Sequence, residues 1–226
     1  MRKLTFFLIA VVIGFQGFTQ SADQSTRRNF STVIDVFNDV YINVPDSVDG
    51  RFFNGGMSFS GFFEHHFGSS NFSAAIGAGL GTHNFYSHSF VVTDSNNVSG
   101  LRPISKLYPG TSHDKNKLSY TYIDFPIELR MRTKTDFRAA VGFKFGVLID
   151  SHSKYKGDDY IAGTDDDLFV KIKDINNIEN LRYGISARFG WRYINVMGFY
   201  SFTNLFEKNR GPEMYPISFG ISLMPF

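Results

Sequence analysis

Three segments of the chain carry every one of their charged residues on one of two alternating phases. In residues 120–133 the odd positions read Thr, Ile, Phe, Ile, Leu, Met and Thr, whereas the even positions include two acidic and two basic residues. Residues 137–150 and 181–193 alternate in the same way, and the ten charged residues of the three segments all share the polar phase. A period of two indicates β-strands, because successive side chains of a strand point to opposite faces.

The two phases differ in side-chain size as well as in polarity. The apolar phase is bulky and aromatic, in a chain with 26 Phe among 226 residues, and the polar phase mixes charges with Gly, Ala and Ser. This profile predicts a lipid-facing exterior around a narrow polar interior. The alternative is a soluble barrel of the lipocalin type, in which the large apolar residues point inward. The residues predicted to face lipid are Ile123, Phe125, Ile127, Leu129, Phe143, Phe145, Phe189 and Trp191.

The polar phase predicts an ion-pair network inside the barrel. A buried charge without a partner is costly, and acidic and basic residues occur here in similar numbers. The predicted members are Asp35, Asp39, Glu64, Asp124, Glu128, Arg130, Arg132, Arg138, Lys144, Asp150, Arg182, Arg188 and Arg192.

Five further segments bring the strand count to eight. They are residues 31–42, 52–66, 72–86, 196–206 and 216–226; the facing of 196–206 stays open because it is aromatic on both phases. Short connections (67–71, 134–135, 194–195) alternate with long ones (43–51, 87–118, 151–180, 207–215). The sequence therefore predicts an all-β fold, an eight-stranded antiparallel up-and-down transmembrane β-barrel with periplasmic turns and extracellular loops. Side chains fill the interior of such a barrel, so we do not expect a wide pore.

The first twenty residues have the pattern of a secretory signal peptide. Arg2 and Lys3 precede the apolar residues 4–13, which are too few to span a bilayer, and small residues follow at Gly17 and Thr19. We expect residues 1–20 to be removed, residues 21–30 to form a short periplasmic segment and residues 31–226 to form the barrel. The alternative is a buried first helix of a cytosolic protein.

Composition excludes several kinds of chemistry. The chain has no Cys, which excludes disulfides, thiolate metal sites and cysteine nucleophiles. Without residues 1–20 its charges balance, so nucleic acid is not an expected partner. We predict no cofactor, no catalytic residue and no histidine metal site. Calcium binding by an acidic segment is a weaker alternative to a solvated loop, and its ligands would be Asp158, Asp159, Asp165, Asp166 and Asp167.

With the strands placed, the segment Tyr122-Ile123-Asp124-Phe125-Pro126-Ile127-Glu128-Leu129-Arg130-Met131-Arg132-Thr133 resembles the central motif of the PorT-like outer-membrane β-barrel family of Bacteroidota. The resemblance continues through the Ala/Gly-rich residues 139–146, through 181–184 and 200–207, and through 211–220. It implies a location in the outer membrane of a Gram-negative bacterium, with membrane lipid as its surroundings. Founding members of that family are linked to type IX protein secretion, so the resemblance implies such a role as an expectation.

Four functions are compatible with this fold. We expect a non-enzymatic accessory or structural subunit of an outer-membrane protein complex for secretion, assembly or uptake, with the long connections 87–118 and 151–180 as its partner-binding surface. The alternatives are a surface adhesin or docking barrel, a small channel, and a lipid-modifying enzyme that uses His83 or His88 near the membrane rim.

Overall fold

The computed structural model describes residues 29–224 of the chain, and it is built almost entirely of β-strands. The predicted signal peptide lies outside these residues. No helix within residues 29–224 is long and apolar enough to cross a bilayer. The elements are β1 (Phe30–Ile42), β2 (Gly55–His66), β3 (Phe72–Tyr86), β4 (Ser89–Thr93), β5 (Ser99–Pro103), α3 (Ile104–Leu107), β6 (His113–Arg132), β7 (Phe137–Asp159), β8 (Thr164–Lys173), β9 (Leu181–Trp191), β10 (Ile194–Ser201) and β11 (Tyr215–Leu223).

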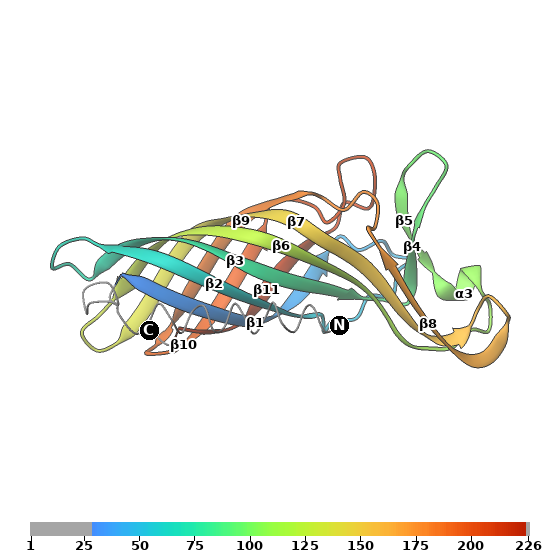
Figure 1. Cartoon of the computed structure of the whole chain (residues 1–226), viewed down its shortest axis with the longest axis horizontal. Helices are drawn as coiled ribbons and strands as arrows, with labels where there is room; N and C mark the ends of the chain where they lie inside the picture. The colour runs from blue at the N-terminus through green and yellow to red at the C-terminus, as the bar shows by residue number, and fades with distance from the viewer. Residues whose placement is uncertain (1–28, 225–226) are drawn as a thin grey trace, which may run out of the picture.

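Eight of the strands close into a ring. Their order is β6-β3-β2-β1-β11-β10-β9-β7, and pairing between β6 and β7 closes it (Figure 1). Every pairing is antiparallel. Each ring strand pairs with the ring strands before and after it in the chain, and the first, β1, pairs with the last, β11. The predicted eight-stranded up-and-down barrel is therefore confirmed.

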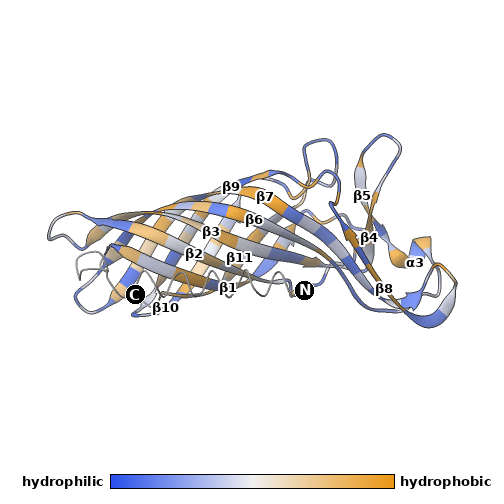
Figure 2. Cartoon of the chain, viewed as in Figure 1, coloured by the Kyte–Doolittle hydropathy of each residue, from blue (hydrophilic) through white to orange (hydrophobic). Residues whose placement is uncertain are grey.

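Side chains alternate between the interior and the exterior of the ring. Along β1, Val33, Asp35 and Phe37 are buried, whereas Val36 between them is 56% exposed. Apolar and polar segments accordingly follow one another along the strands in Figure 2. An apolar outer face suits contact with lipid acyl chains, as transmembrane barrels require.

The two ends of the barrel differ. At one end the connections are short: 67–71 after β2, 133–136 after β6 and 192–193 after β9. At the other end β6 and β7 continue well past the ring. They have 20 and 23 residues, whereas about ten residues are enough for a tilted strand to cross a bilayer. Long connections are extracellular in such barrels, so this end is the outer one.

The long connections are more ordered than the sequence indicates. Residues 87–118 were predicted as a loop, but they form the hairpin β4–β5, helix α3 and the start of β6. Residues 151–180 contain the end of β7 and all of β8, and among the described strands β8 pairs with β7 alone. Apolar and polar residues are mixed in these strands without regular alternation, so the strands lack the pattern that marks a strand within the membrane.

Candidate functional site

The half of the barrel interior nearer the short connections holds a network of ion pairs. The Arg188 guanidinium donates to Asp35 Oδ2 at 2.9 Å and also to Glu128. Arg130 Nε donates to Glu128 Oε2 at 2.8 Å, and Arg130 Nη1 donates to Glu64 Oε2 at 2.9 Å. These five side chains come from β1, β2, β6 and β9, so the network joins strands on different sides of the ring.

A second group of charges lies closer to the outer end. Arg182 Nη2 donates to both Asp124 oxygens at 3.0 and 3.1 Å, and Lys144 Nζ lies 3.7 Å from Asp124 Oδ2. Asp39 Oδ1 accepts a hydrogen bond from Ser218 Oγ. All four charged side chains are buried.

Sequence reasoning missed His83 as a member of this group. We placed it near the membrane rim for the enzyme alternative, but it is buried inside the barrel. Its ring bridges Asp39, 2.7 Å from Nδ1, and Arg182, 2.5 Å from Nε2, and it stacks on Tyr120. His83 occupies an odd position in β3, as does Phe85, which also points inward. The alternation along this strand was the signal that could have placed His83 inside.

Three residues of the predicted network lie outside the interior. Arg132 is the last residue of β6 and pairs with Asp136 at 2.7 Å in the exposed turn that follows. Arg192 has φ 52° in the two-residue turn before β10, and its side chain is 68% exposed. Both predictions were wrong because the strands end at these positions, where the alternation no longer applies.

Asp150 was also wrongly placed, for a different reason. In the β6–β7 ladder Tyr122 pairs with Leu148 and Thr121 pairs with Asp150, so Ile149 is an extra residue in β7. Such a β-bulge reverses the alternation beyond it. Asp150 therefore points outward, where its Oδ2 lies 2.7 Å from His152 Nδ1.

Arg138 lies inside the barrel, yet it has no carboxylate within 4.0 Å in residues 29–224. Its Nη1 reaches the carbonyl of Met224 at 3.4 Å. Within residues 29–224 the inward-facing charges are thus five acidic (35, 39, 64, 124, 128) and five basic (130, 138, 144, 182, 188) side chains, which balance. Aromatic rings complete the packing: Phe62 lies under Arg130, and Phe199 lies under both Lys144 and Arg182.

Phe199 also settles the facing of β10, which the sequence left open. Asn195, Met197, Phe199 and Ser201 are buried, whereas Val196 and Tyr200 are exposed on the outer face.

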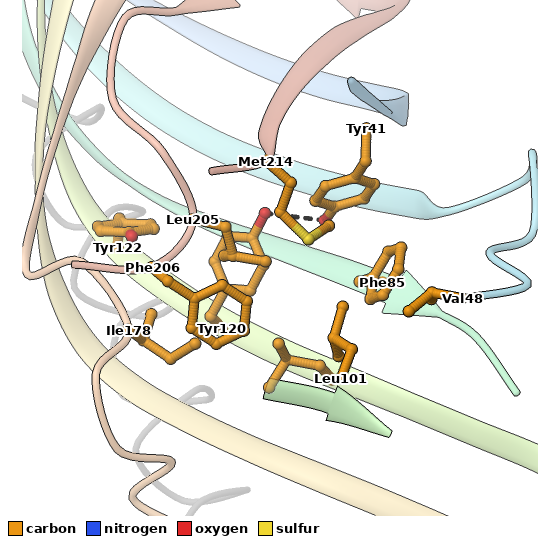
Figure 3. Close-up of a cluster of buried hydrophobic side chains, with 11 residues drawn as sticks. Tyr41, Val48, Phe85, Leu101, Tyr120, Tyr122, Ile178, Leu205, Phe206 and Met214 are labelled. Carbon is orange, nitrogen blue, oxygen red and sulfur yellow. Dashed lines mark hydrogen bonds between the residues drawn. The ribbon is translucent and has the colours of Figure 1, made fainter. Parts of the chain in front are cut away.

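An apolar cap lies over the outer mouth of the barrel (Figure 3). The inner wall contributes Tyr41 and Tyr120, whose hydroxyls are 2.8 Å apart, and Tyr122, whose hydroxyl donates to the Glu179 carbonyl. The inner wall also contributes Phe85 and Leu118. Four separate connections meet over the mouth and contribute the rest of the cap. Their buried residues are Val48, Leu101, Ile178, Leu205, Phe206 and Met214.

The structure does not bring the carboxylates of the acidic segment together. Asp158 Oδ2 accepts from the Ser112 amide, and Asp159 Oδ1 accepts from the Ile161 and Ala162 amides. Within the described part of the chain no three His, Cys, Asp or Glu residues come close enough to hold a metal ion. The ligand set Asp158, Asp159, Asp165, Asp166 and Asp167 is therefore not assembled in the described structure, where Asp158 and Asp159 accept backbone amides instead.

The eight residues predicted to face lipid all lie on the outer face of the ring. Six of them are exposed, and Ile123 and Phe145 are half-buried between their neighbours. Apolar side chains of β2, β3 and β11 continue the same outer surface around the ring, among them Met57, Phe59, Ile76, Leu80, Phe219 and Ile221.

The chain matches the family described as outer membrane protein beta-barrel domain over residues 13–207. A search of curated proteins found no match. The match covers most of the chain and agrees with the closed ring, the inward charges and the apolar outer face. The chain belongs to the outer-membrane β-barrel family, and it resides in the bacterial outer membrane among membrane lipids.

Proposed function

We propose that this protein is a non-enzymatic accessory subunit of an outer-membrane protein complex, with the barrel as its anchor and the outer end as its docking surface. The observation that carries the proposal is the free edge of β8. This strand has ten residues and pairs with β7 alone among the described strands. An unpaired edge offers backbone donors and acceptors to a strand of another chain.

The side chains of β8 support the same proposal. Phe169 is 66% exposed and Ile172 is 54% exposed, on opposite faces of the strand. Both lie past the ring, outside the hydrocarbon layer that the apolar outer face of the ring contacts. Exposed apolar side chains beside an unpaired edge are typical of a protein interface.

The resemblance to the PorT-like family narrows the proposal. It favours a complex of type IX protein secretion, and the motif in residues 122–133 is the feature on which this assignment depends.

The channel and enzyme alternatives have less support. A conducting pore would need an opening through both the ion-pair network and the apolar cap. An enzyme at the rim would need an accessible histidine beside a nucleophile. His83 lies inside the barrel. His88 is partly exposed, but its side-chain partners within the described residues are His113 Nε2, 2.8 Å from its Nδ1, and Asp49 Oδ2, 3.9 Å from its Nε2, with no serine among them.

The experiment is a tagged copy in the native host, extracted in mild detergent, with co-purifying proteins identified and their stoichiometry estimated. We expect a partner in near-equal amount. The variant Phe169→Lys/Ile172→Lys should lose it, while Ile161→Lys in the nearby hairpin tip should keep it. If the wild-type barrel elutes alone and its deletion leaves every outer-membrane complex intact, the proposal is wrong.

A further inference from the structure

A row of lysines crosses the outer extension of the barrel. The strand register places Lys117 of β6 opposite Lys154 of β7, and Lys154 opposite Lys171 of β8. Residues directly opposite in an antiparallel ladder share one face, with their Cβ atoms about 5 Å apart. We call Lys117, Lys154 and Lys171 the lysine row.

The lysine row lies on the same face of the sheet as the lipid-facing residues. On β6 the outward phase runs from Ile127 through Ile123, Thr121 and Ser119 to Lys117. On β7 the bulge at Ile149 turns the even positions outward. Lys154 therefore points to the same side as Lys117.

The position of the row along the barrel corresponds to the polar layer of the membrane. Six residues separate Lys117 from Ile123, which is about 20 Å along a strand and about 14 Å along the membrane normal at a tilt near 45°. Lysine side chains near a membrane edge extend along apolar surface to reach polar headgroups. The ammonium groups are therefore within reach of headgroups beside the barrel.

The lysine row has no acidic partner in residues 29–224. Lys117 Nζ donates to Asn84 Oδ1 at 2.6 Å and lies 5.5 Å from the centre of the Tyr86 ring, and neither group is charged. Of the neighbouring lysines on this face, Lys156 has a carboxylate at 2.8 Å, from Asp114. Like charges placed directly opposite destabilise a sheet, so an anion between them would relieve the repulsion.

We propose that the lysine row binds the phosphate groups of anionic lipids in the outer leaflet. Phosphate accepts several charge-assisted hydrogen bonds at once, and lysine serves as a point charge for it. The row faces sideways along the membrane plane rather than outward into water, which favours lipid over a soluble anion. Lys173, in the adjacent row toward the membrane, adds positive charge on the same face, and its cross-strand neighbour His152 is paired with Asp150 through Nδ1 at 2.7 Å.

The test compares lipid retention by two variants that remove the same charge. The purified full chain is reconstituted in phosphatidylcholine nanodiscs with a minor fraction of bisphosphorylated lipid A, then re-extracted, and the retained lipid A is measured by mass spectrometry. The row variant is Lys117→Gln/Lys154→Gln/Lys171→Gln. The control is Lys106→Gln/Lys134→Gln/Lys208→Gln, whose lysines lie in α3, in a short turn and in the connection before β11.

We expect the row variant to retain at least about tenfold less lipid A than the wild type, since each of the three lysines near an anionic surface contributes up to about fivefold to binding. The control and the variant Lys117→Arg/Lys154→Arg/Lys171→Arg should retain it. Equal retention by the row variant and the control would overturn the proposal, as would inorganic phosphate displacing lipid A at low concentration, which would indicate a free-anion site. If the row variant does not fold, Lys154→Gln alone is compared with Lys106→Gln, with the same outcomes at smaller amplitude.

Discussion

Replacing Arg188 by Met tests how much the interior ion pairs stabilise the barrel. The guanidinium is buried, and it holds Asp35 and Glu128 from two other strands. Met fills a similar volume without a charge. Glu128 keeps Arg130, but Asp35 keeps the hydroxyl of Ser58 and has no second salt bridge within the described residues.

The expected loss is about 3 to 5 kcal/mol, because removing one partner leaves a buried carboxylate uncompensated. Arg192→Met is the matched control, since the sequence predicts the same interior role for both arginines. Arg192 is exposed, and its Nε lies 3.8 Å from Asp136. An exposed pair at that distance contributes about 0 to 1 kcal/mol.

The assay is reversible urea unfolding of the barrel in lipid vesicles, followed by the shift between folded and unfolded bands on an unheated gel. The double variant Asp35→Asn/Arg188→Met should lose less than the sum of the two single losses, because the pair is then removed together. If Arg188→Met is no more destabilising than Arg192→Met, the interior pairs do not stabilise the fold and the reasoning fails.

Three further predictions follow from individual contacts. Burial and the neighbouring charges of Lys115 and Lys154 lower the pKa of Lys117 to about 8. The unfolded chain therefore binds more protons between pH 8 and about 10.4, so stability in detergent should rise with pH across that window, and Lys117→Gln should flatten the rise. Gly79→Ala should abolish the folded gel band, because its Cβ would clash with Ser60 Oγ and the Phe59 carbonyl. The control Gly100→Ala should fold normally, because its Cβ would make only ordinary van der Waals contacts. Phe206→Ala should cost about 3 to 5 kcal/mol in urea unfolding through the cavity left in the cap, and a loss below 1 kcal/mol would show that the cap is not packed as described.

Within the membrane the sequence alone was enough to predict the facing of most residues. Alternation is a local property of a strand, and the lipid on one side and the packed interior on the other act on every strand alike. Asp124, Glu128 and Arg188 could be placed inside, and Phe125 and Phe189 outside, from their phase alone.

Tertiary structure decided the positions where the alternation is interrupted or carries no signal. The bulge at Ile149 turned Asp150 outward and aligned the lysine row with the lipid face, and only the pairing with β6 shows that bulge. His83 contacts Asp39 and Arg182, which are far from it in sequence, so only the folded chain shows these partners. The sequence determined which face each residue of a strand takes, because that depends on neighbours along the chain. Which side chains meet across the ring, and which edge stays free outside the membrane, depends on strand pairing over long sequence separations and needed the closed barrel.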